Sequence, residues 1–298
     1  MKILNFGSCN IDYVYSLDHI VVPGETEMSD ALNIFPGGKG LNQSIALARA
    51  GAKVYHAGVV GSDSKILTDI LSESGVDLSY LKKLDVKNGH AIIQVNKDGE
   101  NSIFLYPGSN NMISEEYIDC VLENFREGDI LLLQNEINNI SYIVREAYKK
   151  NMCIILNPSP FNEKISEVDF NHLSYIILNE VEAEAITGKS CPKESLSFIK
   201  NKYPKLKIML TLGKNGCIYS DGETEVHQDI FRVNAVDTTA AGDTFTGYFI
   251  KGIADGEDIK TVLETSSMAS AIAVSRKGAA PSVPEREEVI KALSAKQK

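Results

Sequence analysis

Residues 236–247, VDTTAAGDTFTG, are the stretch from which the fold class and the chemistry of this chain can be worked out. Small residues lead directly into Asp243, and the apolar spacing from there through Phe249 and Ile253 predicts a helix. The first N–H groups of a helix have no partner inside it, and the helix dipole adds positive potential there. A glycine-containing turn at this place can therefore hold an anion without a basic side chain. Asp243 would lie beside that anion and accept a proton from an attacking hydroxyl group; alternatively, it only caps the helix.

The composition favours one large α/β domain without a nucleic acid or membrane partner. The chain has 298 residues, with 30 Lys and Arg against 40 Asp and Glu, so its formal net charge is −10. Such a chain can bury a substantial core, and its negative charge argues against binding to nucleic acid or anionic membranes. We see no apolar run long enough to cross a bilayer and no secretory signal.

The five cysteines and five histidines are scattered through the sequence. No C-x-x-C pair occurs, so the cysteines indicate reduced thiols in a cytoplasmic protein and neither a disulfide frame nor a zinc site. A dedicated histidine-ligated metal site is not expected either.

Strand-like apolar runs alternate with helical patterns, which is typical of a mostly parallel sheet covered by helices on both faces. The expected strands of this sheet are 3–6, 53–60, 129–134, 153–156, 175–178 and 207–211. The expected helices include 41–50, 64–74 and 141–150. A dinucleotide-binding loop is a weak alternative, because no G-x-G-x-x-G follows the first strand.

Two β runs, 90–95 and 102–106, interrupt this alternation and predict a hairpin. Together with 31–35 they are expected to form a small accessory sheet that stands off the main domain as a lid. We expect the lid to be built from about 13–36 and 88–108. An exposed edge on such a sheet would favour a homodimer.

Polar side chains recur where the expected strands end, which is where open α/β sheets bind their ligands. Each of these residues alone could simply form a turn, but their recurrence indicates a shared site. They are Asn10, Asp12, Glu136, Asn157, Asn179 and Thr211.

Four motifs occur together in the chain: GGKGLNQ at 37–43, the stretch 235–247, N-x-x-E at 179–182, and AIAVSRKGAAPSVP at 271–284. With these motifs the chain resembles the PfkB carbohydrate kinases over essentially its whole length, and within that family most closely the ribokinases. The resemblance implies a single α/β domain, 1–298, with three α/β/α layers, a mostly parallel central sheet and a small β-sheet lid.

The resemblance implies that Asp243 is the general base of a phosphoryl transfer, with the backbone amides of Ala241, Gly242 and Asp243 as the anion hole. Mg²⁺ would accompany the nucleotide phosphates. Asn179 and Glu182 would act through water around that metal. A helix cap followed by a first-turn acid explains the same two residues equally well.

The resemblance also assigns residues to the hydroxyl groups of a sugar. These are Asn10, Asp12, Gly38, Lys39, Gly40, Asn42, Glu136 and Asp243. A tight turn before a helix is the alternative explanation for the glycines. Phe104, Tyr106 and Pro107 are bulkier than the lid residues typical of the family, so the far side of the sugar site is expected to differ.

Two further groups of residues follow from the resemblance. The nucleotide would be bound, together with Asn179, Glu182 and Gly242, by Thr211, Gly213, Lys214, Gly216 and Ser267. A potassium ion would be held by Asp237, Thr239, Ala273, Arg276, Gly278 and Ser282. Carbonyl and carboxyl oxygens suit such a hard cation, and Arg276 would contribute its carbonyl group.

The activity that the resemblance implies is the ATP-dependent phosphorylation of a sugar at its primary hydroxyl group, D-ribose giving ribose 5-phosphate, in carbohydrate metabolism. The same chemistry on 2-deoxyribose, a ketohexose or a nucleoside is the nearest alternative. From a different class, the chain would be a sugar-sensing protein that has lost turnover, because a fold alone does not imply activity.

Overall fold

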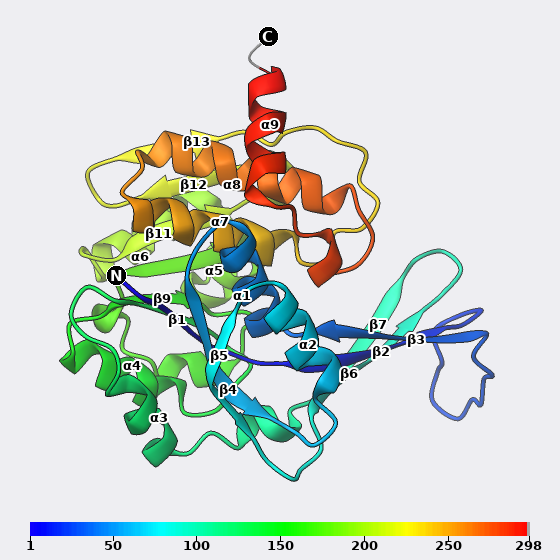
Figure 1. The fold of residues 1–298 in the computed structure, drawn as a ribbon. Helices are drawn as coiled ribbons and strands as arrows, with labels where there is room; N and C mark the ends of the chain where they lie inside the picture. The colour runs from blue at the N-terminus through cyan, green and yellow to red at the C-terminus, as the bar shows by residue number, and fades with distance from the viewer. Residues whose placement is uncertain (297–298) are drawn as a thin grey trace.

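The computed structural model describes residues 1–296, and its main sheet has nine strands (Figure 1). They are β1 (Ile3–Phe6), β4 (Val54–Val60), β5 (Asp77–Lys83), β8 (Ile130–Gln134), β9 (Cys153–Asn157), β10 (Tyr175–Asn179), β11 (Lys207–Thr211), β12 (Cys217–Ser220) and β13 (Glu225–Gln228). Their order is β13-β12-β11-β10-β9-β8-β1-β4-β5. Neighbours from β5 to β11 pair in parallel, and β12 and β13 extend the sheet antiparallel.

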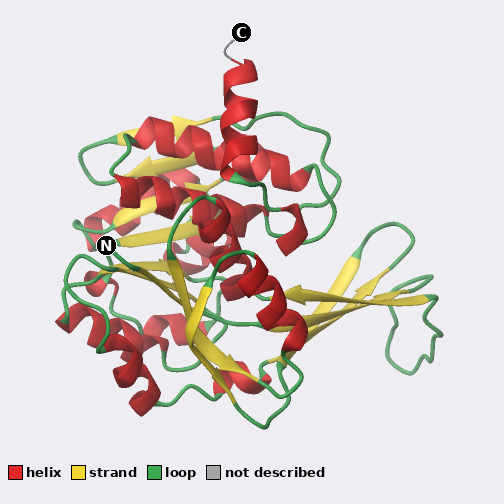
Figure 2. Ribbon diagram, in the orientation of Figure 1, coloured by secondary structure: helices red, strands yellow, loops and turns green. Residues whose placement is uncertain are grey.

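Helices cover both faces of this sheet, so the expected three-layer α/β/α fold is confirmed (Figure 2). One face packs against α3 (Glu115–Leu122), α4 (Ile140–Lys149), α5 (Glu180–Thr187) and α6 (Pro192–Lys202). The other packs against α1 (Lys39–Arg49), α2 (Lys65–Glu73), α7 (Ala241–Asp255) and α8 (Ile259–Val274), and α9 (Arg286–Lys296) lies on α8. Strand side chains alternate between the two cores: Leu4 and Phe6 enter the first and Ile3 the second.

A second sheet of four strands projects from the side of the main body (Figure 1). It consists of β2 (Asn10–Ser16), β3 (Ala31–Gly37), β6 (Gly89–Val95) and β7 (Asn101–Tyr106), in the order β3-β2-β6-β7. We call it the lid sheet. It is joined closely to the main body, because only Gly7, Ser8 and Cys9 separate β1 from β2, and only Gly38 separates β3 from α1.

The structure differs from the sequence patterns in several elements. The expected strand 31–35 continues through Pro36 to Gly37, which is tolerated because β3 is an edge strand. Residues 10–12, expected as polar residues that follow a strand, begin the half-buried strand β2. The patterns also give no prediction for several elements that the structure contains. These are β5, β13, α3, α6, α8 and α9.

Within residues 1–296, no helix combines the length and the apolar character needed to cross a membrane.

Candidate active site

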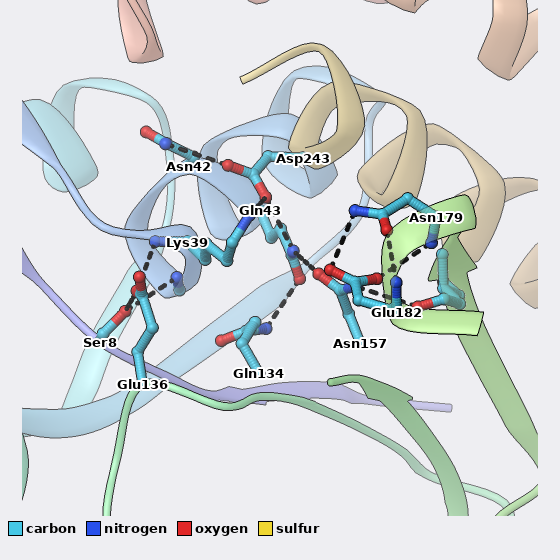
Figure 3. A network of polar contacts seen from close by, with 12 residues as sticks. Ser8, Lys39, Asn42, Gln43, Gln134, Glu136, Asn157, Asn179, Glu182 and Asp243 are labelled. Atoms are coloured by element: carbon cyan, nitrogen blue, oxygen red, sulfur yellow. Dashed lines mark hydrogen bonds and ion pairs between the residues drawn. The ribbon is translucent and has the colours of Figure 1, made fainter. Parts of the chain in front are cut away.

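Asp243 is buried in the first turn of α7 and is held by side chains of α1 (Figure 3). Nε2 of Gln43 donates to its Oδ1 over 2.9 Å, and Nδ2 of Asn42 donates to its Oδ2 over 3.1 Å. The ammonium group of Lys39 lies 3.8 Å from Oδ1. The N-cap of α7 is Ala240, without a side-chain cap, so the simple capping role for Asp243 is wrong.

The turn before α7 directs backbone N–H groups toward open space. Ala240 has φ 59°, a left-handed conformation that reverses the chain just before the helix. Among residues 1–296, the N–H groups of Gly242 and Asp243 have no acceptor, whereas that of Ala241 donates weakly to the Thr238 carbonyl group over 3.3 Å. A Cβ atom at Gly242 would meet nothing within 4 Å. This is the geometry of an anion site at a helix N-terminus.

Two carboxylates lie on the other side of Asp243 and Lys39. Oε2 of Glu136 accepts hydrogen bonds from the Ser8 hydroxyl group and, over 2.9 Å, from the backbone N–H of Lys39. Burial, and then the neighbouring charge of Glu136, raise the pKa of Asp12 to about 7. Burial likewise raises the pKa of Glu136 despite its hydrogen bonds. The charge of Asp243, above all, raises the pKa of Lys39, so its ammonium group stays charged.

Two asparagines in this region have polar atoms available for a ligand. Oδ1 of Asn10 accepts from Nδ2 of Asn110 over 2.7 Å, which leaves Nδ2 of Asn10 to donate elsewhere. Oδ1 of Asn42 is buried and has no partner among the described residues. Because a buried acceptor is almost always paired, this oxygen points to a hydroxyl donor on a ligand.

The glycines between β3 and α1 are required by close contacts. A Cβ atom at Gly37 would lie 2.1 Å from Oδ2 of Asp12. Gly38 has φ 92° and is the N-cap of α1, and a Cβ atom there would lie 2.9 Å from the backbone nitrogen of Asn10. A Cβ atom at Gly40 would lie 2.3 Å from the backbone nitrogen of Ser8. The tight turn expected for these glycines is therefore observed, and it sets the first turn of α1 close to Asn10, Asp12 and Ser8.

The N-x-x-E motif forms a capping box at the start of α5 (Figure 3). Oδ1 of Asn179 accepts from the backbone N–H of Glu182 over 2.9 Å, and Oε2 of Glu182 accepts from the backbone N–H of Asn179 over the same distance. The side chain of Glu182 is buried. The helix-cap explanation is thus observed, and the role around a metal stays a prediction.

A pocket of about 720 Å³ lies on the other side of the α7 N-terminus. Its wall includes the predicted nucleotide residues Thr211, Gly213, Lys214, Gly216, Gly242 and Ser267. Apolar side chains that the sequence did not single out complete it. They are Ile230, Phe231, Val233, Phe245 and Val274. Ala241 and Gly242 line this pocket and also begin the turn that carries Asp243, so the pocket and the carboxylate meet at the open amides.

Of the predicted cation residues, Thr239 and Gly278 bond Asp237 directly. Its Oδ1 accepts from the N–H of Thr239 and its Oδ2 from the N–H of Gly278, both over 2.9 Å. Burial acts to raise the pKa of Asp237, but these hydrogen bonds outweigh it and hold the pKa below its usual value. The guanidinium group of Arg276 pairs with Glu288 over 2.6 Å. The carbonyl group of Ala273 accepts from the N–H of Arg276, and the buried Ser282 donates to Ala279.

The structure groups one histidine with acidic residues, which the sequence did not predict. His19, Glu25 and Glu27 of the β2–β3 connection lie with their ligand atoms within 4.8 Å of one another. Nε2 of His19 already bonds Oε1 of Glu25 over 2.8 Å, and His19 and Glu27 are exposed. The group is explained as a surface ion pair.

The sequence patterns included Gln43 only as part of a motif and gave no site role to Ser8, Asn110 or Gln134. Gln134 is the last residue of β8 and Gln43 lies on α1, while Ser8 lies between β1 and β2 and Asn110 in the short 3-10 turn after β7. Their contacts join segments far apart in the chain, so no local pattern could identify them.

Comparison with known proteins gives a consistent result. The model of the pfkB family carbohydrate kinases matches residues 1–286. The chain is 35% identical to the ribokinase of Bacillus subtilis, covering 97% of this chain and 98% of that one. It is 30% identical to the deoxyribokinase of Salmonella typhimurium over 99% of both chains. The structure of Arabidopsis thaliana ribokinase complexed with ribose and ATP superposes with a TM-score of 0.88, at 28% identity and 98% coverage of both chains.

Proposed function

The chain belongs to the pfkB family of carbohydrate kinases, and we propose that it transfers the γ-phosphoryl group of ATP to the primary hydroxyl group of D-ribose. The observation that carries this proposal is the position of Asp243. Its buried carboxylate lies between a sugar-side cluster of polar groups and the open amides that border the 720 Å³ pocket.

The geometry supports the following transfer. The carboxylate of Asp243 accepts the proton of the sugar hydroxyl group as the hydroxyl oxygen forms a bond to the γ-phosphorus. The bond from that phosphorus to the bridging oxygen of ADP breaks, and ADP leaves with the electron pair. The N–H groups of Gly242 and Asp243, at the positive end of α7, hold the transferring phosphoryl group. Lys39, whose ammonium lies 3.8 Å from Asp243, stabilises negative charge on the same side.

On the sugar side, the available groups are Nδ2 of Asn10, Oδ1 of Asn42 and the carboxylates of Asp12 and Glu136. Carboxylates and amides are suited to adjacent sugar hydroxyl groups, which can donate and accept at once. In the pocket, the mostly apolar wall suits a nucleobase, and Lys214 is available for the phosphates.

Two cations fit the residues present. When bound, Mg²⁺ supplies charge neutralisation on the nucleotide phosphates, and the Glu182 carboxylate, which has lone pairs beyond its two capping bonds, would hold it through water. The oxygen-rich loop around Asp237, together with Thr239, Ala273, Arg276, Gly278 and Ser282, would hold K⁺. This loop leads directly into the turn that begins α7, so K⁺ there would order the anion site without touching the sugar.

We also propose that two copies pair through the lid sheet. Its edge strands expose Leu32 and Ile34 on β3 and Ile103 and Phe104 on β7, with exposed fractions of 49%, 47%, 53% and 59%. Edge strands with such apolar side chains are suited to pairing with another copy.

The five free cysteines support a cytoplasmic location.

One alternative substrate has its own support: 2-deoxyribose, because a deoxyribokinase is among the relatives. The test is ATP consumption with Mg²⁺ and K⁺ against ribose, 2-deoxyribose, fructose, adenosine and inosine. We expect ribose to be preferred by kcat/KM. Preference for another substrate would contradict the assignment of ribose but keep the proposed mechanism. Absence of turnover with the whole panel would contradict the proposed activity.

A further inference from the structure

A chain of buried side-chain amides starts at Asp243 and runs away from it into the core (Figure 3). Nε2 of Gln43 bonds Asp243; Oε1 of Gln43 accepts from Nε2 of Gln134 over 2.7 Å; and the same Nε2 of Gln134 donates to Oδ1 of Asn5 over 2.9 Å. We call Gln43, Gln134 and Asn5 the amide chain. Their exposed fractions are 0%, 1% and 0%.

The direction of every hydrogen bond in the amide chain is fixed by its surroundings. Nδ2 of Asn5 donates to the carbonyl oxygen of Gly40 over 2.7 Å, and a carbonyl oxygen can only accept, so Oδ1 of Asn5 must face Gln134. At the other end, Nε2 of Gln43 faces the carboxylate of Asp243. Gln134 therefore lies between two oxygens and gives one N–H to each of them.

Asn157 fixes Gln43 from a third side. Nδ2 of Asn157 donates to the carbonyl oxygen of Ile177 over 2.9 Å, so its Oδ1 is the end that receives Nε2 of Gln43 over 3.0 Å. Both N–H groups of Gln43 are thus committed, one to Asp243 and one to Asn157. Gln43 cannot rotate without breaking a bond at each of its three contacts.

This arrangement leaves one polar atom without a partner. Among the described residues, Oε1 of Gln134 is buried and has no hydrogen bond, and a Cβ atom at Gly7 would lie 2.6 Å from it. A buried acceptor without a donor lowers stability. An apolar residue at position 134 would avoid that loss, so the amide must bring a compensating gain. The gain visible here is the pair of N–H groups that hold Gln43 and Asn5.

We infer that Gln43 is a positioning residue for the phosphoryl transfer: it holds the Asp243 carboxylate in the orientation in which it accepts the sugar proton, and Gln134 holds Gln43 in turn. This inference rests on the proposed role of Asp243. The other charged groups that face Asp243 are Lys39 of α1 and Glu136 after β8, with Glu182 of α5 beyond Lys39.

The main variant is Gln43→Glu, which keeps the shape and the acceptor for Gln134 but turns an oxygen toward Asp243 and toward Oδ1 of Asn157. Two facing carboxylates share a proton, so the acidic limb of the kcat–pH profile should move to higher pH, with activity partly recovering above neutral pH. Gln43→Met removes the donor without adding charge. It should lower kcat by about 10- to 100-fold, with KM for ribose and for ATP changed less than about threefold.

Gln134→Met tests the second link. If Gln134 acts through Gln43, the loss of kcat in the double variant Gln43→Met/Gln134→Met should equal the loss in Gln43→Met alone, because the two effects are not additive. Ser44→Ala is the matched control. It removes two buried hydrogen bonds of 2.8 Å, one from Nδ2 of Asn5 and one with Nδ1 of His56. Asn5 is still oriented by Gly40, so the variant should lower the melting temperature but leave kcat and its pH profile unchanged.

The outcomes separate this inference from the proposed function. If the wild-type protein turns over and Asp243→Asn does not, but Gln43→Glu and Gln43→Met keep the wild-type kcat and pH profile, the positioning role is overturned and the proposed function stands. If Gln134→Met does not fold, the two Gln43 variants still decide the role of Gln43. Absence of wild-type turnover contradicts the proposed function, and the positioning role falls with it.

Discussion

Asn110 donates from Nδ2 to Oδ1 of Asn10 over 2.7 Å, while its own Oδ1 accepts the backbone N–H of Cys9 over 3.1 Å. The second bond fixes which end of Asn110 is nitrogen, and the first therefore fixes Asn10. The part of the site that we propose to bind the sugar thus receives an N–H group from Asn10, although Asn110 itself was not expected to belong to the site.

Replacing Asn110 should weaken sugar binding. The variant Asn110→Leu has a similar shape but no donor, so Asn10 is free to present either end of its amide. We expect KM for ribose to rise about fivefold, which corresponds to about 1 kcal/mol for one hydrogen bond, with KM for ATP unchanged. Steady-state kinetics measures both, and equal changes in the two KM values would contradict this role.

Removing the base should abolish turnover. We expect Asp243→Asn to lower kcat by about 10³- to 10⁴-fold, because an amide cannot accept the sugar proton. Sugar binding should be largely retained, since Asn10, Asp12 and Glu136 are untouched, and calorimetric titration with ribose measures it. Near-normal turnover in this variant would refute the general-base role.

The free protein should become less stable between about pH 4 and pH 7 because of Asp12. Its pKa rises from 3.8 to about 7 on folding, so the folded protein keeps a proton that the unfolded chain loses. The stability from this group is complete below pH 4 and is lost as the pH rises to about 7. The melting temperature of Asp12→Asn relative to that of the wild type should therefore rise between pH 4 and about pH 7 and stay constant above pH 7.

Thermal unfolding without sugar, followed from pH 5 to pH 8.5, measures this difference. Glu136→Gln is a useful companion, because the charge of Glu136 is the second cause of the raised pKa of Asp12. In Glu136→Gln the pKa of Asp12 should be lower, so the loss of stability caused by Asp12 should be complete at a lower pH than in the wild type. A melting-temperature difference that does not vary with pH would show that Asp12 does not titrate in this range.

A small substitution at Gly242 should separate stability from activity. A Cβ atom there meets nothing within 4 Å, and alanine is favoured over glycine in a helix by about 1 kcal/mol, so Gly242→Ala should not destabilise the fold. The added methyl group would occupy the space before the open amides, and kcat should fall at least about tenfold. Gly247→Ala is the contrast: its Cβ atom would lie 2.4 Å from that of Ala46, so it should lose melting temperature.

Monovalent cations should change the rate. If the loop around Asp237 holds K⁺, activity should be higher in KCl than in NaCl or without monovalent salt, and Asp237→Asn should remove the difference. Initial rates at constant ionic strength measure this. Equal rates in all three conditions would eliminate the cation assignment.

The sequence predicted the elements whose pattern is local. The buried strands β1, β8 and β9 are short apolar runs, and α4 (Ile140–Lys149) lies where a helix over 141–150 was expected. The Asp243 stretch predicted a helix start with free amides, and α7 begins there. By contrast, β2 was not predicted as a strand: its first two residues are buried and the next five half-buried, without alternation, and it follows β1 without a clear turn.

The parts of the site that depend on contacts between distant segments could not be predicted. Gln134 and Gln43 are 91 positions apart, and Asn110 is 100 positions from Asn10. Each is an ordinary polar residue in its own neighbourhood, and only the assembled fold shows which groups its amide nitrogen and oxygen face. The apolar wall of the pocket, with Phe231 and Val233, comes from a segment without helix or strand periodicity.

The short connections of the lid sheet have a mechanical consequence. Three residues tie β2 to β1, and Gly38 alone ties β3 to α1, whose first turns carry Lys39, Asn42 and Gln43. Because both connections are short, a tilt of the lid sheet would also displace Ser8 and the first turn of α1. A partner that binds the edge strands β3 or β7, including a second copy of the chain, would therefore change how Lys39, Asn42 and Gln43 are placed around Asp243.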